Sequence, residues 1–395
     1  MKIGRTAVIA VALLAVTVTL AAAPTPGGKS GGRLPDTGTS ATDLKLGSRQ
    51  APVDGAHGSD SQPKGVPYAE GVIPSGTDSI HVVRRSTSGK HFSAVGVNWR
   101  KTQDSTISVA IRTKLDKKAK WSSWHATTAE ETGGTGDRDG TGLLWTGPAV
   151  AADIAVTSVR GELPTEVRAS LIDPGRRAED TAQRQPEITL KAGSNDKVKL
   201  PIRTRAAWGA NEKQMTWKPQ YAPKVQAVVI HHTATTTDYS ADQVPAILRS
   251  IYQYQAIDRG WGDIGYNIIV DKYGQAWEGR AGGVDKPVIG AHAEGFNTGT
   301  AGITLIGNYV TSKPTSQALD TLAKAIAYKL GPPKIDPMGT ISLTGGPGPR
   351  YAKGATVKVP TVIGHETVGR TACPGKNLDA ALPDLRKRAK ALLSV

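Results

Sequence analysis

Cysteine and phenylalanine are nearly missing from this chain of 395 residues. It has one cysteine, Cys373, so no disulfide can form within the chain. A lone cysteine can be buried and inert, or it can be a reactive thiol, form a disulfide with another chain or bind a metal. The count alone does not choose between these alternatives. Only 2 Phe accompany 8 Trp and 10 Tyr. The aromatic side chains are therefore mostly ones with a polar group, common on wet surfaces and in grooves that bind sugars.

Acidic residues are too few to balance the basic ones. The chain has 34 Asp and Glu against 49 Lys and Arg, and both halves share the resulting net charge of +15. This charge permits attraction to polyanions, including those of a cell wall, or serves solubility alone. No RNP-like or helix-turn-helix pattern accompanies it, which argues against nucleic acid as a partner.

Long apolar runs are also scarce, and the clearest one stands at the start of the chain. Residues 1–23 combine two positive residues (Lys2 and Arg5), an apolar stretch (Thr6–Leu20) and three alanines (Ala21–Ala23). This is the pattern of a secretory signal peptide that is removed after export. An uncleaved membrane anchor is the alternative, but the stretch is rich in Ala and Thr and only weakly apolar. We therefore expect a secreted protein without a stable membrane anchor.

The length and the residue patterns of the rest of the chain predict separate domains and linkers. At about 150 residues per domain, the chain predicts two to three domains. Residues 24–65 are rich in Gly, Ser, Pro and Asp without periodicity, which predicts a flexible linker. Residues 66–175 place apolar residues at every second position between turn signals, which predicts an all-β, sandwich-like domain. Residues 176–200 are charged and irregular and predict a second linker, although 187–191 suit a short strand.

Residues 201–395 alternate between strand and helix patterns, which predicts an α/β domain. Apolar runs at 227–230 and 301–306 suit buried strands, and the segments 240–260 and 315–330 show the 3.6-residue period of amphipathic helices. The remaining expectations are a hairpin around 272–274, a long Pro- and Gly-rich surface loop over 331–360, a short strand at 361–363 and a basic helix over 379–393.

Histidines and the cysteine follow predicted strands in this domain. His231 and His232 come directly after an apolar run, and neighbouring strand residues point to opposite faces, so at most one of them faces a given site. His365 follows another short strand, and Cys373 comes eight residues later. Imidazole and thiolate together suit zinc, and three protein ligands with an open fourth position are the catalytic form of a zinc site. From spacing alone, the alternative to a zinc site is that these histidines bind no metal and are hydrogen-bonded in the core or lie at the surface.

Seven short motifs in this half stand in the order found in one known family. They are Arg205–Gly209 (RAAWG), Val229–Ala234 (VIHHTA), Trp261–Asn267 (WGDIGYN), Trp277–Arg280 (WEGR), Gly290–Ala293 with Phe296 and Asn297 (GAHA…FN), Gly302–Asn308 (GITLIGN) and Gly364–Gly375 (GHETVGRTACPG). With them, residues 201–395 resemble the peptidoglycan recognition proteins, whose enzymatic members are zinc-dependent N-acetylmuramoyl-L-alanine amidases of type 2. The first 200 residues carry no part of this resemblance.

The resemblance implies a mixed β-sheet flanked by helices and assigns the residues of the site. It gives Zn²⁺ three ligands, His231, His365 and Cys373. It makes Tyr266 the catalytic tyrosine. Thr371 stands where the phage enzyme carries a catalytic lysine and many animal members carry threonine, so a catalytic role falls to it as well.

Four further residues lie in the matching motifs and are candidates for substrate contact: His232, His292, Asn297 and Trp261. His232 alternatively faces away from the metal or lies behind its ligands. The chain departs from the family pattern at Glu366 and Thr367, where Arg-Asp is often found. That departure and the long loop over 331–360 leave the groove contacts open.

The function that the resemblance implies is cleavage of the amide between N-acetylmuramic acid and L-alanine in peptidoglycan, outside the cell and at the cell wall. A binding module of the same fold that recognises peptidoglycan without cutting it is the alternative. A different zinc hydrolase, such as a carboxypeptidase, is disfavoured because no H-E-x-x-H motif occurs.

The predicted β domain then has a place in this function as a targeting module. Four of its tryptophans are candidates for wall contacts: Trp99, Trp121, Trp124 and Trp145. A tethered second contact raises the effective concentration of an insoluble substrate, and positive charge adds attraction to anionic wall polymers. A structural or inhibitory role for this domain is the alternative, as is packing in the core or at an edge for Trp121 and Trp124.

Overall fold

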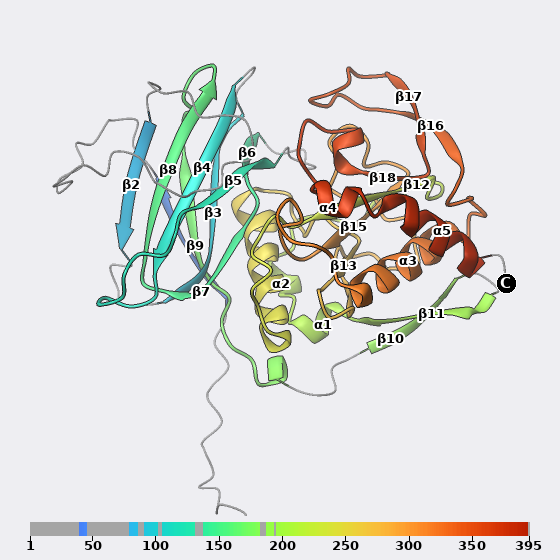
Figure 1. The fold of residues 1–395 in the computed structure, drawn as a ribbon, viewed down its shortest axis with the longest axis horizontal. Coiled ribbons are helices and arrows are strands. Elements are labelled where there is room, and N and C mark those ends of the chain that lie inside the picture. Colours follow the sequence, from blue (N-terminus) through green and yellow to red (C-terminus); the bar gives the residue numbers. More distant parts are fainter. Residues whose placement is uncertain are drawn as a thin grey trace, which may run out of the picture. The chain divides into compact units, whose positions relative to one another are not determined.

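A computed structural model describes the chain from Thr39 to Leu393, with gaps (Figure 1). The described residues are 39–45, 79–85, 91–101, 105–130, 137–181, 187–192 and 195–393. They belong to one compact unit, Pro35–Val395. The predicted signal segment, residues 1–23, lies outside the described residues. Within the described part, no helix is both long enough and apolar enough to cross a membrane.

The first described domain is built of antiparallel strands. They are β1 (Ser40–Lys45), β2 (Ser79–Arg85), β3 (Phe92–Arg100), β4 (Thr106–Lys114), β5 (His125–Glu130), β6 (Arg138–Thr141), β7 (Leu144–Ala149), β8 (Ala151–Arg160) and β9 (Arg168–Asp173). Hydrogen bonds connect them in the order β1-β9-β3-β6-β5-β4-β8-β2, with β7 paired to β3. We call this region the β domain.

Period-two patterning builds the core of the β domain. In β4 the side chains of Ile107, Val109 and Ile111 are buried while their neighbours are more exposed, as the sequence pattern predicts. They pack in one cluster with residues from β3, β7, β8 and β9. The described residues of this domain form strands and no helix, as the all-β prediction expects. That the strands form a two-sheet sandwich stays a prediction. Strand β1 lies inside 24–65, so that segment is not wholly a linker.

The second domain is built around a mixed seven-stranded sheet. Its strands are β10 (Glu187–Ala192), β11 (Asn195–Arg203), β12 (Ala227–His232), β13 (Ile268–Val270), β14 (Ala276–Glu278), β15 (Thr300–Leu305) and β18 (Val362–Gly364), in the order β10-β11-β14-β13-β15-β12-β18. Strands β13, β15, β12 and β18 run parallel to their neighbours in that series. We call this region, Glu187–Leu393, the amidase-like domain. Its first two strands lie partly in the segment 176–200, for which the sequence predicts a linker with a short strand at 187–191.

Helices cover both faces of this sheet (Figure 1). They are α1 (Arg205–Trp208), α2 (Val244–Tyr252), α3 (Ser316–Leu330), α4 (Lys376–Asp379) and α5 (Leu382–Leu393), with α2 continued by the π-helix η4 (Gln253–Asp258). Short 3₁₀ turns are η1 (Ala178–Thr181), η2 (Glu212–Gln214), η3 (Ala241–Gln243) and η5 (His365–Thr367). Helices α3 and α5 share a core with Val228 and Ile230, while α1, α2 and η4 share another with Ile269 and Trp277.

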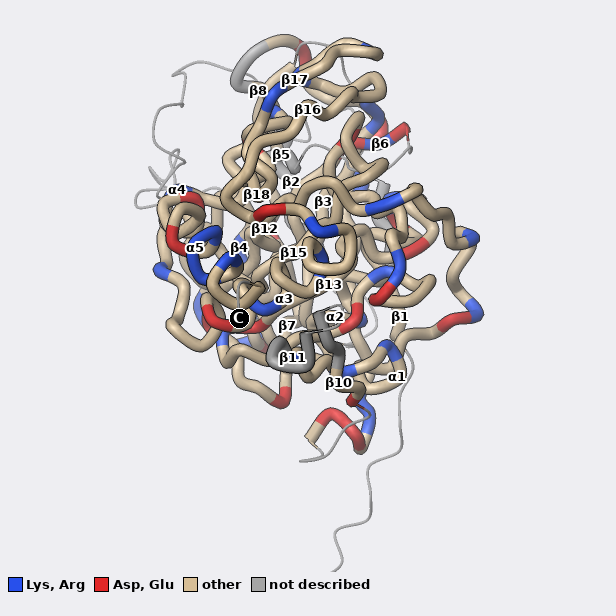
Figure 2. The backbone as a smooth tube through the Cα atoms, turned by 90° about the vertical axis from the view of Figure 1, so that its right-hand side faces the viewer, with Lys and Arg blue, Asp and Glu red and all other residues tan. Residues whose placement is uncertain are grey.

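The segment predicted as a long surface loop contains a hairpin. Strands β16 (Thr340–Thr344) and β17 (Thr356–Pro360) pair antiparallel within 331–360, so a structureless loop is wrong there. Buried Leu343 and Val359 pack with Val229 and Ile363 of the sheet. The pattern was hard to detect because only one residue in each strand is fully buried. Around this domain, basic and acidic residues are interspersed along the backbone (Figure 2).

Candidate metal centre

Strand parity selects which histidine faces the site. In β12, Val228 and Ile230 point toward α3, whereas Val229 points toward the β16–β17 hairpin. Because side chains alternate along a strand, His231 lies on the hairpin side and His232 on the α3 side. Adjacent β18 runs parallel, and its Gly364 pairs with Ile230. The two residues that follow in register, His231 and His365, are therefore neighbours.

Three potential ligands meet at this edge of the sheet. His231, His365 and Cys373 each offer a ligand atom, and these atoms all lie within 4.8 Å of one another. The His231 and His365 rings lie 4.6 Å apart between centroids, and the Cys373 Sγ lies 3.6 Å from the His231 Nδ1. All three residues are buried. The structure thus brings together the three residues that the sequence resemblance assigned as ligands.

Local hydrogen bonds bring Cys373 back to the sheet. The Glu366 N–H donates to the Cys373 carbonyl at 2.7 Å, and the Cys373 N–H donates to the Thr371 Oγ1 at 3.1 Å. The His232 N–H points at the Cys373 Sγ from 3.3 Å. A backbone N–H aimed at a sulfur favours the thiolate, which is the form that binds metals.

His292 lies behind His231. The His231 Nε2 is 3.0 Å from the His292 Nδ1, so the two rings share a hydrogen bond. Glycines make room for this ring: a Cβ at Gly290 or at Gly302 would lie 2.4 Å from the His292 Cδ2. Metal-bound histidines usually have such a partner on their second nitrogen, which fixes the ring and its tautomer. Both glycines lie in motifs that the sequence resemblance singled out.

Burial keeps the histidines of this site neutral. Desolvation lowers the pKa of His292 to about 3 and that of His365 to about 4, and it lowers the pKa of His231 well below its ordinary value of 6.5. Neutral imidazole is the form that ligates metal ions. At neutral pH the site therefore presents lone pairs instead of positive charges.

Two predicted catalytic residues border the ligands. The Tyr266 ring centroid lies 5.3 Å from that of His231. Thr371 lines a cavity of about 820 Å³ whose other walls come from the β17 strand, Arg350, Tyr351, Glu366 and Thr367. The ligand cluster thus has a tyrosine beside it, and residues next to His365 and Cys373 in the chain line an open cavity. Strand β17 of the hairpin within 331–360 supplies part of this cavity.

The other predicted site residues have structural contacts of their own. His232 accepts the Tyr309 N–H at its Nδ1, 3.2 Å away, on the far side of the sheet. Asn297 accepts the N–H groups of His292 and Ala293. Trp261 is buried with its ring 4.9 Å from the Arg259 guanidinium. Contact of these residues with substrate stays a prediction.

A buried ion pair outside the predicted site residues holds the segment leading to Tyr266. The Arg205 guanidinium lies 3.0 Å from the Asp263 carboxylate and also pairs with Glu212. Asp263 in turn accepts the N–H groups of Ile264 and Ala281, at 2.7 Å each. The sequence motifs contain both residues of this ion pair, since Arg205 is the first residue of RAAWG and Asp263 lies within WGDIGYN.

Comparison with known proteins identifies the family. The family described as N-acetylmuramoyl-L-alanine amidase matches residues 221–376. The chain is 31% identical over 181 residues to peptidoglycan-recognition protein SC2 of Drosophila simulans, an alignment that covers 45% of this chain and 83% of that protein. The chain belongs to the peptidoglycan recognition protein and type 2 amidase family. A second family, described as Rv3811 N-terminal galactose-binding domain-like, matches residues 47–187.

Relatives in this family include both enzymes and recognition proteins. The human N-acetylmuramoyl-L-alanine amidase is 30% identical over 179 residues, covering 45% of this chain and 27% of that protein. Peptidoglycan recognition protein-LE, solved in complex with tracheal cytotoxin, is 27% identical with a TM-score of 0.37, covering 46% of this chain and 92% of that one. Family membership therefore leaves catalysis and recognition to be separated by the residues of the site.

Proposed function

We propose that this protein is a secreted zinc hydrolase that cleaves the amide between the lactyl group of N-acetylmuramic acid and the L-alanine of the stem peptide. The observation that carries the proposal is the buried cluster of His231, His365 and Cys373 beside Tyr266. Peptidoglycan as the partner follows from the family, and secretion rests on the pattern of residues 1–23.

The donor set fits zinc. Two imidazoles and one thiolate are ligands that zinc takes at about 2.0 and 2.3 Å, and tetrahedral geometry then separates nitrogen from sulfur by about 3.6 Å. The His231 Nδ1 and the Cys373 Sγ lie 3.6 Å apart. Three ligands leave a fourth position for water or substrate, which is the catalytic form of the site.

Each residue of the site then has a defined task in hydrolysis. Zinc, when bound, lowers the pKa of water and polarises the amide carbonyl. In this proposal the Tyr266 hydroxyl hydrogen-bonds the attacking water or the oxygen on which negative charge develops. Thr371 is a neutral donor to that oxygen. Water adds its hydroxyl to the carbonyl carbon, and its proton goes to the leaving L-alanine amine.

His292 is the residue that orients His231. If His231 binds zinc through Nδ1, the atom nearest Cys373, its Nε2 carries the proton and donates to the Nδ1 of His292. Such partners raise the basicity of the ligand and hold its ring in place. His292 therefore acts through His231 and does not need to touch the substrate.

Recognition without cleavage is the competing function within this family. A binding protein needs the groove but neither the thiolate nor the tyrosine, and non-catalytic relatives typically lose one of them. This chain keeps both Cys373 and Tyr266, next to two neutral histidines. The complete set favours the enzyme.

Analysis of digestion products tests the proposal. Intact sacculi are incubated with the full chain, with the chain after chelation and with the chelated chain after zinc is restored. We expect mass spectrometry to find peptides that begin with L-alanine and glycan strands that keep their lactyl groups, in the first and third samples only. Tight binding without release of peptides would instead support recognition, and cuts within the glycan or the peptide would show a different hydrolase.

A further inference from the structure

The β domain and the amidase-like domain share one hydrophobic core. Ala94, Leu143, Trp145 and Ile172 of the β domain are buried in the same cluster as the residues of α2 and η4. A module that swings freely on a linker has no such shared core, because each domain then covers its own apolar surface. Two of the tryptophans predicted to be available for wall contacts, Trp99 and Trp145, are in fact buried.

Tyr254 of η4 fits into the β domain at two glycines. A Cβ at Gly96 would lie 2.3 Å from the Tyr254 Cε2, and a Cβ at Gly140 would lie 2.8 Å from its hydroxyl. The hydroxyl donates to the Val97 carbonyl at 2.8 Å, within the buried interior. Only residues without a side chain allow this approach, so the docking is specific to these positions.

The segment Thr141–Trp145 of the β domain reaches the catalytic residues. The Trp145 N–H donates to the Thr235 Oγ1 at 2.6 Å, and Thr235 stands four residues after His231. Thr141, Gly142 and Leu143 line a small cavity of about 10 Å³ together with Thr233 and Tyr266 of the amidase-like domain. A space of this size holds about one water molecule.

We infer that Thr141–Trp145 is a wall of the catalytic site and that Leu143 is a positioning residue for Tyr266. This inference rests on the proposed function. Leu143 and Tyr266 belong to the same buried cluster and line the same small cavity, while the Trp145 N–H holds the loop that follows β12. A shift of about 1 Å at a catalytic group lowers turnover strongly, so a wall that fixes Tyr266 affects the chemistry itself.

The inference differs from targeting in what it predicts for small substrates. A tethered binding module raises the effective concentration of an insoluble polymer and leaves the rate on a soluble fragment unchanged. A wall of the site changes the rate on both. Soluble muropeptides therefore separate the two roles of the β domain.

Two adjacent leucines provide a matched pair of variants. Leu143 and Leu144 are each 6% exposed, but Leu143 belongs to the shared core and Leu144 to the core of the β domain alone. Leu143→Ala and Leu144→Ala remove the same atoms at neighbouring positions. Both are assayed in the full chain on a soluble muropeptide, at a temperature where each variant is folded by circular dichroism.

We expect Leu143→Ala to lower kcat on the order of ten-fold with little change in KM and with zinc content intact. Leu144→Ala is expected to stay within about two-fold of the unaltered chain, because it loosens a core that lacks contact with Tyr266. Leu143→Met, which nearly conserves volume, restores most of the rate. Equal rates for Leu143→Ala and the unaltered chain, or equal losses in both alanine variants, would overturn the inference.

Hydrogen exchange gives a readout that does not depend on activity. We expect Leu143→Ala to speed amide exchange in peptides covering 251–266, and Leu144→Ala to speed it only within the β domain. If the unaltered chain releases no L-alanine peptides while this exchange pattern holds, the proposed function fails and the docking stands. If Leu143→Ala leaves exchange in 251–266 unchanged, the inference that Thr141–Trp145 positions Tyr266 is wrong, whatever the activity of the variant.

Discussion

The two domains differ in what they bury. In the described part of the β domain, the core cluster from β3, β4, β7, β8 and β9 is apolar, and the Arg100–Glu166 ion pair lies at the surface. The amidase-like domain buries more charged and ligating groups, among them the Arg205–Asp263 pair and His231, whereas the buried charged residues in the described part of the β domain are Arg138 and Asp153. Buried polar groups are expensive unless they are paired, so their concentration in one domain marks where the chemistry occurs.

The first way to test this difference is to remove the thiolate. Cys373→Ser replaces the sulfur with a hydroxyl, which is a far poorer zinc ligand. We expect the variant to lose zinc and to fall to background in the peptidoglycan assay, while circular dichroism shows the fold retained. Elemental analysis of purified protein measures the metal. Full turnover in the serine variant would make Cys373 a packing residue.

The second test removes one hydroxyl at the site. Tyr266→Phe deletes a donor with almost no change in packing, so turnover is expected to fall on the order of 10²-fold with normal zinc content. Tyr328→Phe is the control, since Tyr328 is also 5% exposed but lies in the core with α3. We expect the control to retain nearly full activity. The same activity in both variants would assign Tyr266 to structure.

The third test removes the partner of His231. His292→Leu keeps a side chain of similar size but replaces the imidazole with an apolar group and so deletes the Nδ1 atom, and zinc affinity is expected to fall between about 10- and 100-fold. His292→Asn retains a polar atom near that position and is expected to recover part of the affinity. Competition with a zinc-binding dye measures both variants. Unchanged affinity in the leucine variant would rule out the orienting role.

The sequence predicts the elements of the amidase-like domain better than its boundaries. Periodicity predicts α3 and the strands β12 and β15, because their apolar residues are buried at the expected positions. In the charged segment 176–200 it allows the short strand at 187–191, which is the edge strand β10, but it misses the first part of β11. Edge strands bury less apolar surface and therefore show weaker periodicity.

The sequence also predicts the candidate metal ligands, but it does not predict the residues that pack behind them. The motifs place His231, His365 and Cys373 together, and strand parity then explains why His232 faces the other way. Nothing in the spacing places His292 behind His231, because that contact depends on the room that Gly290 and Gly302 leave for the His292 ring. The shared core with the β domain is equally hidden, since Leu143 and Leu144 look alike in sequence.

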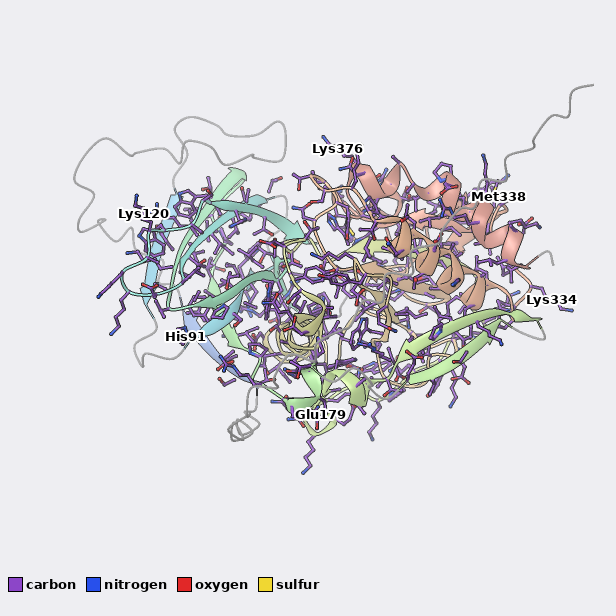
Figure 3. All side chains as sticks on the ribbon, turned by 60° about the horizontal axis from the view of Figure 1, so that its bottom comes forward. His91, Lys120, Glu179, Lys334, Met338 and Lys376 are labelled. Atoms are coloured by element: carbon purple, nitrogen blue, oxygen red, sulfur yellow. The ribbon has the colours of Figure 1, made fainter. Side chains whose placement is uncertain are left out.

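The smallest expected effect concerns a basic loop of the β domain that lies away from this core. Between β4 and β5, Lys117, Lys118 and Lys120 are exposed, and the Asp116 carboxylate accepts the N–H groups of Lys118 and Ala119. Lys120 lies at the outer rim of the β domain (Figure 3). Nearby, the Arg112 guanidinium stacks over both Trp121 and Trp124, so these half-buried rings are partly covered.

If this loop attracts anionic wall polymers, changing its three lysines to serine should weaken binding to sacculi a few-fold at low salt. The difference should disappear at high ionic strength, because exposed charges are then screened. Hydrolysis of soluble muropeptides should be unchanged, in contrast to Leu143→Ala. The matched control removes three exposed lysines of the amidase-like domain, Lys213, Lys218 and Lys224. Co-sedimentation with sacculi over a salt series measures binding of both triple variants. If both lose binding equally, the attraction comes from the net charge of the chain. The β domain would then keep only its proposed role as a wall of the catalytic site.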